Sequence, residues 1–316
     1  MAKEFASKAD LGEKKISFIE LGKGCYGYTA EGDPNSGVIV GDDSIMVIEA
    51  QATPRMAKDV IKKIRSVTHK PIKYLVLTHY HAVRVLGASA YDVDEIIMSK
   101  KTNEMVEERG KQDWKSEFER FPRLFKGYES IPGLTHPSMI FEDKLTIDLG
   151  NKKVEIMHLG EGHTRGDSIV WVPDERVLFA GDLVEYGATP YCGDAQLKNW
   201  PLTLQKLSDL KPKALVPRRG DALKNELECQ EAIQMTSEYV TMLYQQALLS
   251  VTRNESLKSC YDSLMKSMTP RFGDWVIFEH CMPFNVTRAY DEASGILHPR
   301  IWTDKRDIEM WNELNS

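Results

Sequence analysis

The apolar and polar positions of the chain predict alternating strands and helices over most of its length. Residues 16–50 carry short β-rich runs, and Gly41-Asp42-Asp43 provides turn chemistry between two of them, which predicts a hairpin. Residues 54–67 have apolar side chains near helical spacing, and the apolar run at 72–77 predicts a buried strand. This strand leads directly into Thr78-His79-Tyr80-His81, so a loop with histidines follows a buried strand.

The same alternation continues toward the middle of the chain. We predict further elements at 92–98 (strand), 100–121 (helix), 139–160 and 168–184 (paired β segments), 202–210 (helix) and 214–217 (strand). Two β-rich halves with helices between them favour two sheets packed face to face, with the helices outside.

The pattern changes after Gly220. Residues 224–268 are helical in composition, and the last 45 or so mix proline, glycine and aromatic side chains. We therefore predict one domain over residues 15–222 and a C-terminal helical extension, residues 223–316, packed on it. The extension could form a dimer surface or a lid over a pocket, and its composition favours neither.

Composition narrows the class of protein. The 316 residues carry a net charge of -6, so no basic surface is expected and nucleic acid is excluded as a partner. The chain has no apolar run near the ~18 residues of a membrane helix and no apolar segment at its start, so we expect a cytoplasmic protein with no membrane contact. The five cysteines are odd in number and have no C-x-x-C spacing, which predicts reduced thiols.

Three short motifs carry the candidate chemistry, each at the end of a predicted strand. His79 and His81 are two residues apart, so in extended backbone both imidazoles point to the same side. Alone, such a pair is also expected in a loop where hydrogen bonds satisfy the rings. The pair is followed by His163 in Gly-His-Thr-Arg-Gly-Asp and by Asp182 in Leu-Phe-Ala-Gly-Asp. Three imidazoles and a carboxylate are a suitable ligand set for Zn²⁺ or Fe²⁺.

The order, spacing and flanking residues of these motifs resemble the metallo-β-lactamase superfamily over roughly residues 15–222. The resemblance implies an α+β fold, the αββα metallo-β-lactamase sandwich, with the C-terminal helical extension added. It also implies that His79, His81, His163 and Asp182 are metal ligands. In the family Asp182's counterpart bridges to a second metal ion.

Two departures from the family's motifs concern that second ion. The family's T-H-x-H-x-D-H-x-x-G has Val83 and Arg84 here in place of its Asp and third His. The family's V-P-G-H-G turn is Val-Pro-Arg-Arg-Gly here, with Arg219 at the histidine position. All ligands of the first ion are kept and all three that serve only the second are replaced. The resemblance therefore predicts one divalent metal ion as cofactor, with zinc favoured over iron.

The replacement by arginine suggests a function. Arginine stays protonated in proteins and cannot coordinate a cation. Our hypothesis is that Arg84 and Arg219 replace the second ion electrostatically, either by pairing with Asp182 or by holding an anionic group of the substrate. The alternative is a decayed site in which the arginines only neutralise leftover carboxylates.

The resemblance implies hydrolysis by a metal-bound hydroxide, with Asp182, Arg84 and Arg219 as catalytic candidates. The aspartate that handles protons in the family is replaced by Val83 here. The sequence therefore leaves the identity of the general base open. Asp182 itself, Glu161 and His158 are candidates, and the last two are also expected in purely structural roles.

Substrate contacts are expected from the loop after Asp182, because it leaves the strand that carries a ligand. Tyr186 and Tyr191 are the candidates, together with Arg84 and Arg219; simple packing is the alternative for the tyrosines. His280 could reach the site from the extension, or be a hydrogen-bonded core histidine.

The favoured function is thus a mononuclear metal-dependent hydrolase of a small-molecule ester, thioester, lactone or related substrate, with an anionic group as an option. Two alternatives stay open: a mono-iron dioxygenase of the same fold and a metal-free anion-binding or regulatory protein. A homodimer is also left open.

Overall fold

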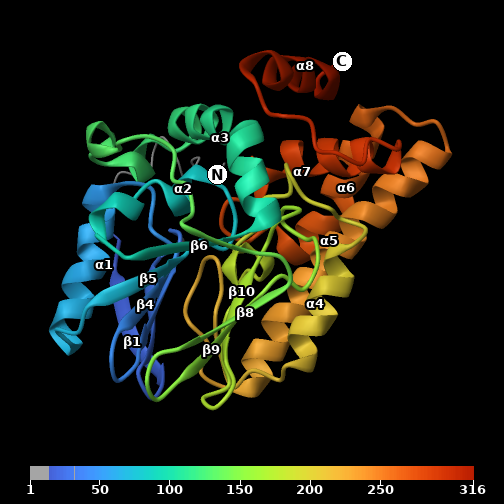
Figure 1. Cartoon of the computed structure of the whole chain (residues 1–316). Coiled ribbons are helices and arrows are strands. Elements are labelled where there is room, and N and C mark those ends of the chain that lie inside the picture. Colours follow the sequence, from blue (N-terminus) through green and yellow to red (C-terminus); the bar gives the residue numbers. More distant parts are fainter. Residues whose placement is uncertain (1–13, 32) are drawn as a thin grey trace.

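The computed structural model describes residues 14–31 and 33–316, and its strands form two sheets that face each other (Figure 1). The first sheet has seven strands in sequence order, antiparallel from β1 to β4 and parallel from β4 to β7. The second has five strands in the order β12-β11-β10-β9-β8, in which β11 and β12 are parallel and the other pairs antiparallel.

The strands of the first sheet are β1 (Ile16–Gly22), β2 (Cys25–Ala30), β3 (Ser36–Val40), β4 (Ile45–Ile48), β5 (Ile72–Val76), β6 (Glu95–Ser99) and β7 (Met139–Phe141). Those of the second are β8 (Lys144–Asp148), β9 (Lys153–Met157), β10 (Ile169–Val172), β11 (Val177–Phe179) and β12 (Ala214–Val216). The helices are α1 (Pro54–Val67), α2 (Ala82–Val85), α3 (Lys100–Arg120), α4 (Trp200–Asp209), α5 (Glu226–Thr252), α6 (Leu257–Phe272), α7 (Phe278–Ala293) and α8 (Asp304–Leu314).

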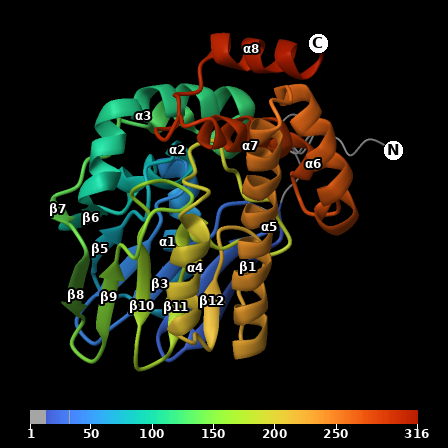
Figure 2. The ribbon, with the colours of Figure 1, turned by 90° about the vertical axis from the view of Figure 1, so that its right-hand side faces the viewer.

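The layers follow from which faces are apolar. Side chains from both sheets, among them Ile39, Val76, Val170 and Phe179, form one buried cluster between them. The other face of the first sheet packs with α1 and α3, and the other face of the second packs with α4 to α7. Figure 1 shows α1 at one side and α4 and α5 at the other, and Figure 2 shows α4 and α5 over the second sheet. This confirms the predicted αββα sandwich.

Helix α1 shows how local sequence fixes an element. Thr53 accepts a hydrogen bond from the Met56 amide at 3.2 Å, and Pro54 occupies the first helical position, where its missing N–H is not needed. Val60 and Ile64 then lie on the buried face. The predicted range of 54–67 is confirmed.

The C-terminal part contains more regular structure than its pattern suggests. Two helices each contain a proline, Pro270 in α6 and Pro283 in α7, a residue that normally marks a helix end. Helix α5 packs against α4 and covers the second sheet, whereas α3, α7 and α8 gather at one end of the sandwich (Figure 2). The boundary at residue 222 stays a prediction.

Two smaller predictions can be compared with the structure. All five cysteines are free and buried, as expected. Among the described helices, none combines the length and apolar character needed to cross a membrane.

Candidate metal centre

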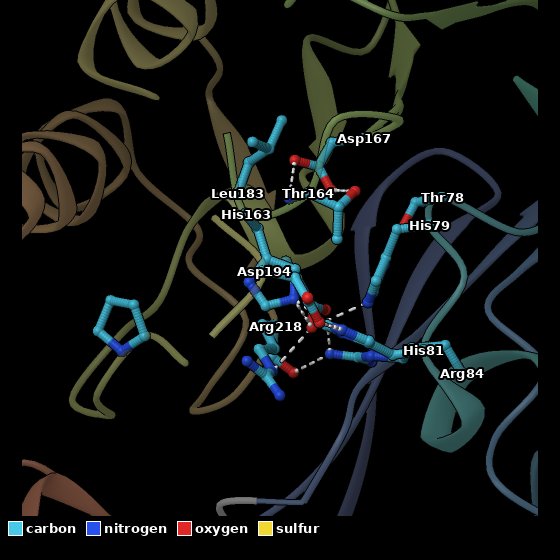
Figure 3. A network of polar contacts seen from close by, with 12 residues as sticks. Thr78, His79, His81, Arg84, His163, Thr164, Asp167, Leu183, Asp194 and Arg218 are labelled. Atoms are coloured by element: carbon cyan, nitrogen blue, oxygen red, sulfur yellow. Dashed lines mark hydrogen bonds and ion pairs between the residues drawn. The ribbon is translucent and has the colours of Figure 1, made fainter. Parts of the chain in front are cut away.

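The four predicted ligands come together at the end of the sandwich where several strands finish. His79 and His81 follow β5, His163 lies in the loop between β9 and β10, and Asp182 follows β11. Their ligand atoms all lie within 4.8 Å of one another, and all four side chains are buried. Figure 3 shows His79, His81 and His163 directed toward one another. The sequence spacing therefore identified a real cluster.

Gly181 allows Asp182 to approach the first sheet. Its φ is +54°, and a Cβ atom there would lie 2.5 Å from Thr78 Oγ1. Only glycine fits this conformation and contact without strain. The same Thr78 hydroxyl lies 3.1 Å from His79 Nδ1, so one side chain adjoins the glycine and orients an imidazole.

The imidazole nitrogens converge on one carboxylate. His79 Nε2 lies 3.2 Å and His163 Nε2 lies 3.4 Å from Asp182 Oδ2, while His81 Nδ1 lies 3.0 Å from His163 Nε2. Neither His79 Nε2 nor the Asp182 oxygens have a hydrogen bond of good geometry. Buried polar atoms without such a bond are costly unless something else satisfies them. The donor set and its convergence fit a divalent metal ion.

Two of the histidines are held neutral, which is the form that binds metal. Burial lowers the pKa of His79 to about 4 and puts that of His163 well below its usual range. For His81, burial also lowers the pKa, but Asp113 and Asp194 outweigh it and raise the value to about 9 in the metal-free protein.

Asp194 supports His81 from outside the cluster. Its Oδ2 accepts a 2.6 Å hydrogen bond from the Tyr80 hydroxyl and lies 3.3 Å from His81 Nε2, and its Oδ1 accepts from Arg109 Nη1 at 2.9 Å. Burial would raise the pKa of Asp194, but His81 and Arg109 lower it to about 2. This leaves His81 Nδ1 directed at the cluster, an arrangement typical of metal-binding histidines. Sequence reasoning missed Asp194, because its loop carries no motif.

Two arginines also contact the Asp182 carboxylate, one at each oxygen. Arg84 Nη2 lies 2.6 Å from Oδ1 and Arg218 Nε lies 2.9 Å from Oδ2. Arg84 also donates to the backbone oxygens of Asn35 at 2.7 Å and Arg218 at 3.2 Å. Burial would raise the pKa of Asp182, but the Arg218 and Arg84 guanidinium groups outweigh it and hold the pKa well below its usual range.

The structure changes the predicted arginine pair. The pairing of Arg84 with Asp182 agrees with our hypothesis, but the second partner is Arg218, not Arg219. Alignment of the motif placed Arg219 at the ligand position, whereas the turn after β12 directs Arg218 inward. Arg219 is also buried, and Arg218 and Glu185 are among the charges that act on it. Its role toward a substrate stays a prediction.

The candidate bases occupy structural positions. Glu161 lies 3.1 Å from Lys101 Nζ and accepts a hydrogen bond from Asn199 at 3.2 Å. His158 Nδ1 lies 2.7 Å from the Asp167 carbonyl oxygen. Asp167 itself accepts from the Thr164 amide and hydroxyl, both at 2.7 Å, and so holds the turn that carries His163. These contacts favour the structural alternative for Glu161 and His158.

The two tyrosines are in different surroundings. Tyr191 is buried with its ring centroid 6.1 Å from that of His81, and it lines a small cavity beside the cluster together with Tyr80, Asp113, Asp194 and Trp302. Tyr186 is 37 % exposed. His280 packs its ring against Phe121 and Phe284, at centroid distances of 5.1 and 5.7 Å. Tyr191 thus lies beside the cluster and Tyr186 at the surface, and a substrate contact of either tyrosine stays a prediction.

The fold and the ligand cluster agree with a comparison of family models. Residues 29–219 match the model described as the metallo-beta-lactamase superfamily. The chain therefore belongs to this superfamily.

Individual relatives are distant. A type 2 metallo-beta-lactamase of Pseudomonas aeruginosa is 24 % identical over 231 residues, 69 % of this chain and 83 % of that protein. One of Bacteroides fragilis is 33 % identical over 113 residues, 34 % of this chain and 45 % of that protein. The solved structure of a metallo-beta-lactamase from Pontibacter korlensis has a TM-score of 0.57 and 20 % identity, covering 72 % of this chain and 99 % of the other. At 20 % identity, this solved structure supports the fold alone. The substrates of the relatives are not assigned to this chain.

Proposed function

We propose that the protein is a hydrolase that works with one divalent metal ion, zinc in preference to iron, on a small ester, thioester, lactone or related substrate. The observation that carries the proposal is the unequal surroundings of Asp182. His79 Nε2 and His163 Nε2 lie within 3.4 Å of its Oδ2, and His81 completes the ligand cluster. Arg84 Nη2 lies 2.6 Å from Oδ1, and Arg218 Nε lies 2.9 Å from Oδ2.

His79 Nε2, His81 Nδ1, His163 Nε2 and Asp182 Oδ2 would hold the ion. A divalent ion in such a site supplies a Lewis acid and makes water a nucleophile at neutral pH.

The protein's own residues orient this set. Thr78 and Asp194 fix the outer nitrogens of His79 and His81, so neither ring needs to reorganise. Arg84 is anchored on backbone oxygens and keeps Asp182 ionised. With their positive charge fixed in a buried site, Arg84 and Arg218 would also stabilise negative charge that develops on a substrate oxygen.

Arg84 stands at the sequence position of a second-ion ligand and contacts Asp182 Oδ1, and Arg218 from the turn after β12 contacts Oδ2. A second cation there would face both guanidinium charges at short range, which a buried site does not screen. This repulsion favours a stoichiometry of one ion per chain.

The proposal is tested by metal content and activity together. Protein purified without added chelator is expected to contain about one equivalent of metal by plasma mass spectrometry. Chelation should remove it together with hydrolysis of a panel of p-nitrophenyl esters, thioesters and lactones, and Zn²⁺ should restore both. The variant His163→Ala should lose metal and activity, whereas His136→Ala, at an exposed histidine paired with Glu107, should keep both.

Other outcomes lead to the alternatives. Two equivalents of metal, or full hydrolysis after chelation, would contradict the proposal. Oxygen consumption that requires Fe²⁺ and is absent with Zn²⁺ would favour the dioxygenase. Metal-free protein that binds an anion but hydrolyses nothing would favour the binding protein.

A further inference from the structure

Asp194, the carboxylate that supports His81, lies in a segment of irregular structure. Residues 190–198, here called the Asp194 loop, contain no helix or strand, and residues 190–197 are all buried. Buried N–H and C=O groups cannot bond to water, so those of an irregular segment need partners elsewhere in the protein. The position of Asp194 therefore depends on which groups bond to this loop.

Asn285 of α7 holds the start of the Asp194 loop. Its Oδ1 accepts a hydrogen bond from the Cys192 amide at 2.7 Å, and its Nδ2 donates to the Pro190 carbonyl oxygen at 2.8 Å. The same Nδ2 donates to the Tyr239 hydroxyl of α5 at 2.8 Å. With both ends of its amide bonded, the side chain has one orientation and holds two backbone groups of the loop at once.

Arg288 and Glu292 of the same helix hold the end of the loop. Arg288 Nε donates to the Ala195 carbonyl oxygen at 2.8 Å. Glu292 accepts hydrogen bonds from the amides of Leu197 and Lys198 at 2.9 and 3.0 Å. The two side chains also pair with each other at 2.9 Å, so each buried charge has a partner of opposite sign.

These three side chains lie on one face of α7, because residues 285, 288 and 292 are three and four positions apart. All three are buried. Buried polar side chains weaken a fold unless they are hydrogen-bonded, and the bonds described above go to the loop on both sides of Asp194. Figure 2 shows α7 at the end of the sandwich where α3 also lies. This face of the helix is thus suited to holding one loop.

Residues beyond α7 hold Asp194 more directly. Trp302 is buried, and its Nε1 donates to the carbonyl oxygen of Gly193 at 3.1 Å. Arg109, whose Nη1 donates to Asp194 Oδ1, also donates from Nη2 to the Pro299 carbonyl oxygen at 3.1 Å. The C-terminal extension therefore reaches Asp194 through its neighbour in the chain and through its arginine partner.

The position of Asp194 in turn determines the orientation of His81. The Asp194 Oδ2 atom lies 3.3 Å from His81 Nε2, and the opposite ring nitrogen, Nδ1, is directed at the ligand cluster. Because both nitrogens belong to one rigid ring, a shift of the carboxylate would turn Nδ1 away from the cluster.

We propose that the C-terminal extension is part of the metal centre, and that it holds Asp194, and through it His81, in the geometry that binds the ion. The proposal rests on the proposed function, because it explains how the proposed metal site is kept in order. It gives the extension a role other than a dimer surface or a lid. The positioning residues are Asn285, Arg288, Glu292 and Trp302.

The contacts to the loop are tested first in the full-length protein after chelation. Hydrogen exchange followed by mass spectrometry should show that residues 190–198 exchange about fivefold faster or more in Asn285→Ala, since a hydrogen bond contributes about that factor. Tyr290→Phe is the matched control, because it removes a 2.7 Å bond from α7 to the Glu255 carbonyl oxygen, away from the loop. It should leave this exchange unchanged.

The link to the metal centre is tested by competition for Zn²⁺ with a chromogenic chelator. Asn285→Ala should weaken Zn²⁺ binding about three- to tenfold, less than the loss of a direct partner of a metal ligand. Trp302→Phe keeps an aromatic ring, removes the donor to Gly193 and should act in the same direction, which covers misfolding of the first variant. Tyr290→Phe should keep the wild-type affinity.

A double variant separates positioning from general loss of packing. In an Asp194→Asn background, Asn285→Ala should weaken Zn²⁺ binding by less than about twofold, because its effect passes through the Asp194 carboxylate. An effect of the same size in both backgrounds would overturn the proposal, as would unchanged exchange of the loop in Asn285→Ala.

The remaining outcomes distinguish this proposal from the proposed function. Metal-dependent hydrolysis with wild-type Zn²⁺ affinity in both Asn285→Ala and Trp302→Phe would contradict this proposal alone. Zn²⁺ affinity that falls in these variants, in a protein that hydrolyses none of the tested substrates, would contradict only the hydrolase.

Discussion

The two sides of Asp182 show two ways of balancing one buried carboxylate. On the histidine side, imidazole nitrogens within 3.4 Å lack good hydrogen bonds to it. On the arginine side, Arg84 and Arg218 supply permanent charge and are themselves buried. Arg84 and Arg218 balance the charge of Asp182 without a metal ion, whereas the imidazole nitrogens are directed as ligands for one. Charge replacement of the second ion and simple neutralisation of a leftover carboxylate both predict these two pairings.

The largest expected effect comes from removing the residue that both sides share. Asp182→Ala would leave Arg84 and Arg218 buried beside each other without their counter-charge. Breaking a buried ion pair from one side typically costs about 3–5 kcal/mol. Urea unfolding in the presence of chelator should show a loss of this size, and the variant should bind no metal.

A surface pair serves as the control. Asp262→Ala removes the exposed carboxylate that lies 2.8 Å from Lys258 in α6, and exposed pairs contribute under about 1 kcal/mol. If Asp182→Ala cost no more than this control, the arginine side would not be the charge-balanced structure described above.

Much of the fold could be predicted because its signals are local. The ranges of α1 and of β5 follow from apolar spacing and a capping residue, and the three ligand motifs each end a strand. The helices α7 and α8 could not be predicted in the same way, because Pro283 and scattered aromatics obscure the helical pattern and their packing partners are distant in sequence.

The site was predictable in part for the same reason. His79, His81, His163 and Asp182 lie in motifs, and the structure brings them together. Arg218 and Asp194 were missed, since their roles depend on which way a turn or loop directs its side chain. One residue of shift in the turn after β12 separates Arg218 from the predicted Arg219. Motif alignment fixes order along the chain, but not the direction of a side chain.

A smaller effect is expected from the outer support of the histidine side. Asp194→Asn keeps the shape of the side chain but removes the negative charge that lies 3.3 Å from His81 Nε2. Loss of such a partner typically lowers metal affinity about 10- to 100-fold. Competition with a chromogenic chelator for Zn²⁺ measures the change.

Glu108→Gln is the matched control. Arg109 donates from Nη1 to Asp194 and from Nη2 to Glu108, at 2.7 Å, but Glu108 is not among the His81 contacts. It should leave Zn²⁺ affinity unchanged. Equal affinities of the Asp194→Asn and wild-type proteins would show that the histidine side is oriented without this carboxylate.

The smallest predicted effect concerns the pH dependence of stability on the histidine side. Burial depresses the pKa of His79 to about 4 in the folded, metal-free protein, below the value of about 6.5 in an unfolded chain. Its contribution to stability is present above pH 6.5 and is lost as pH falls toward 4. The loss reaches at most about 1.4 kcal/mol for each pH unit within this window. His81, with its pKa raised to about 9, acts in the opposite sense and loses its contribution only above pH 6.5.

Urea unfolding of the chelated wild-type and His79→Gln proteins at pH 6.5 and 5.5 measures this contribution. The other titrating groups are the same in both proteins, so the difference between them comes from His79. Wild type should lose more stability than the variant over that unit. Parallel losses in the two proteins would mean that His79 already carries a proton in the folded metal-free state. Its Nε2 would then donate to Asp182 at 3.2 Å, and the histidine side would balance the carboxylate by charge as the arginine side does.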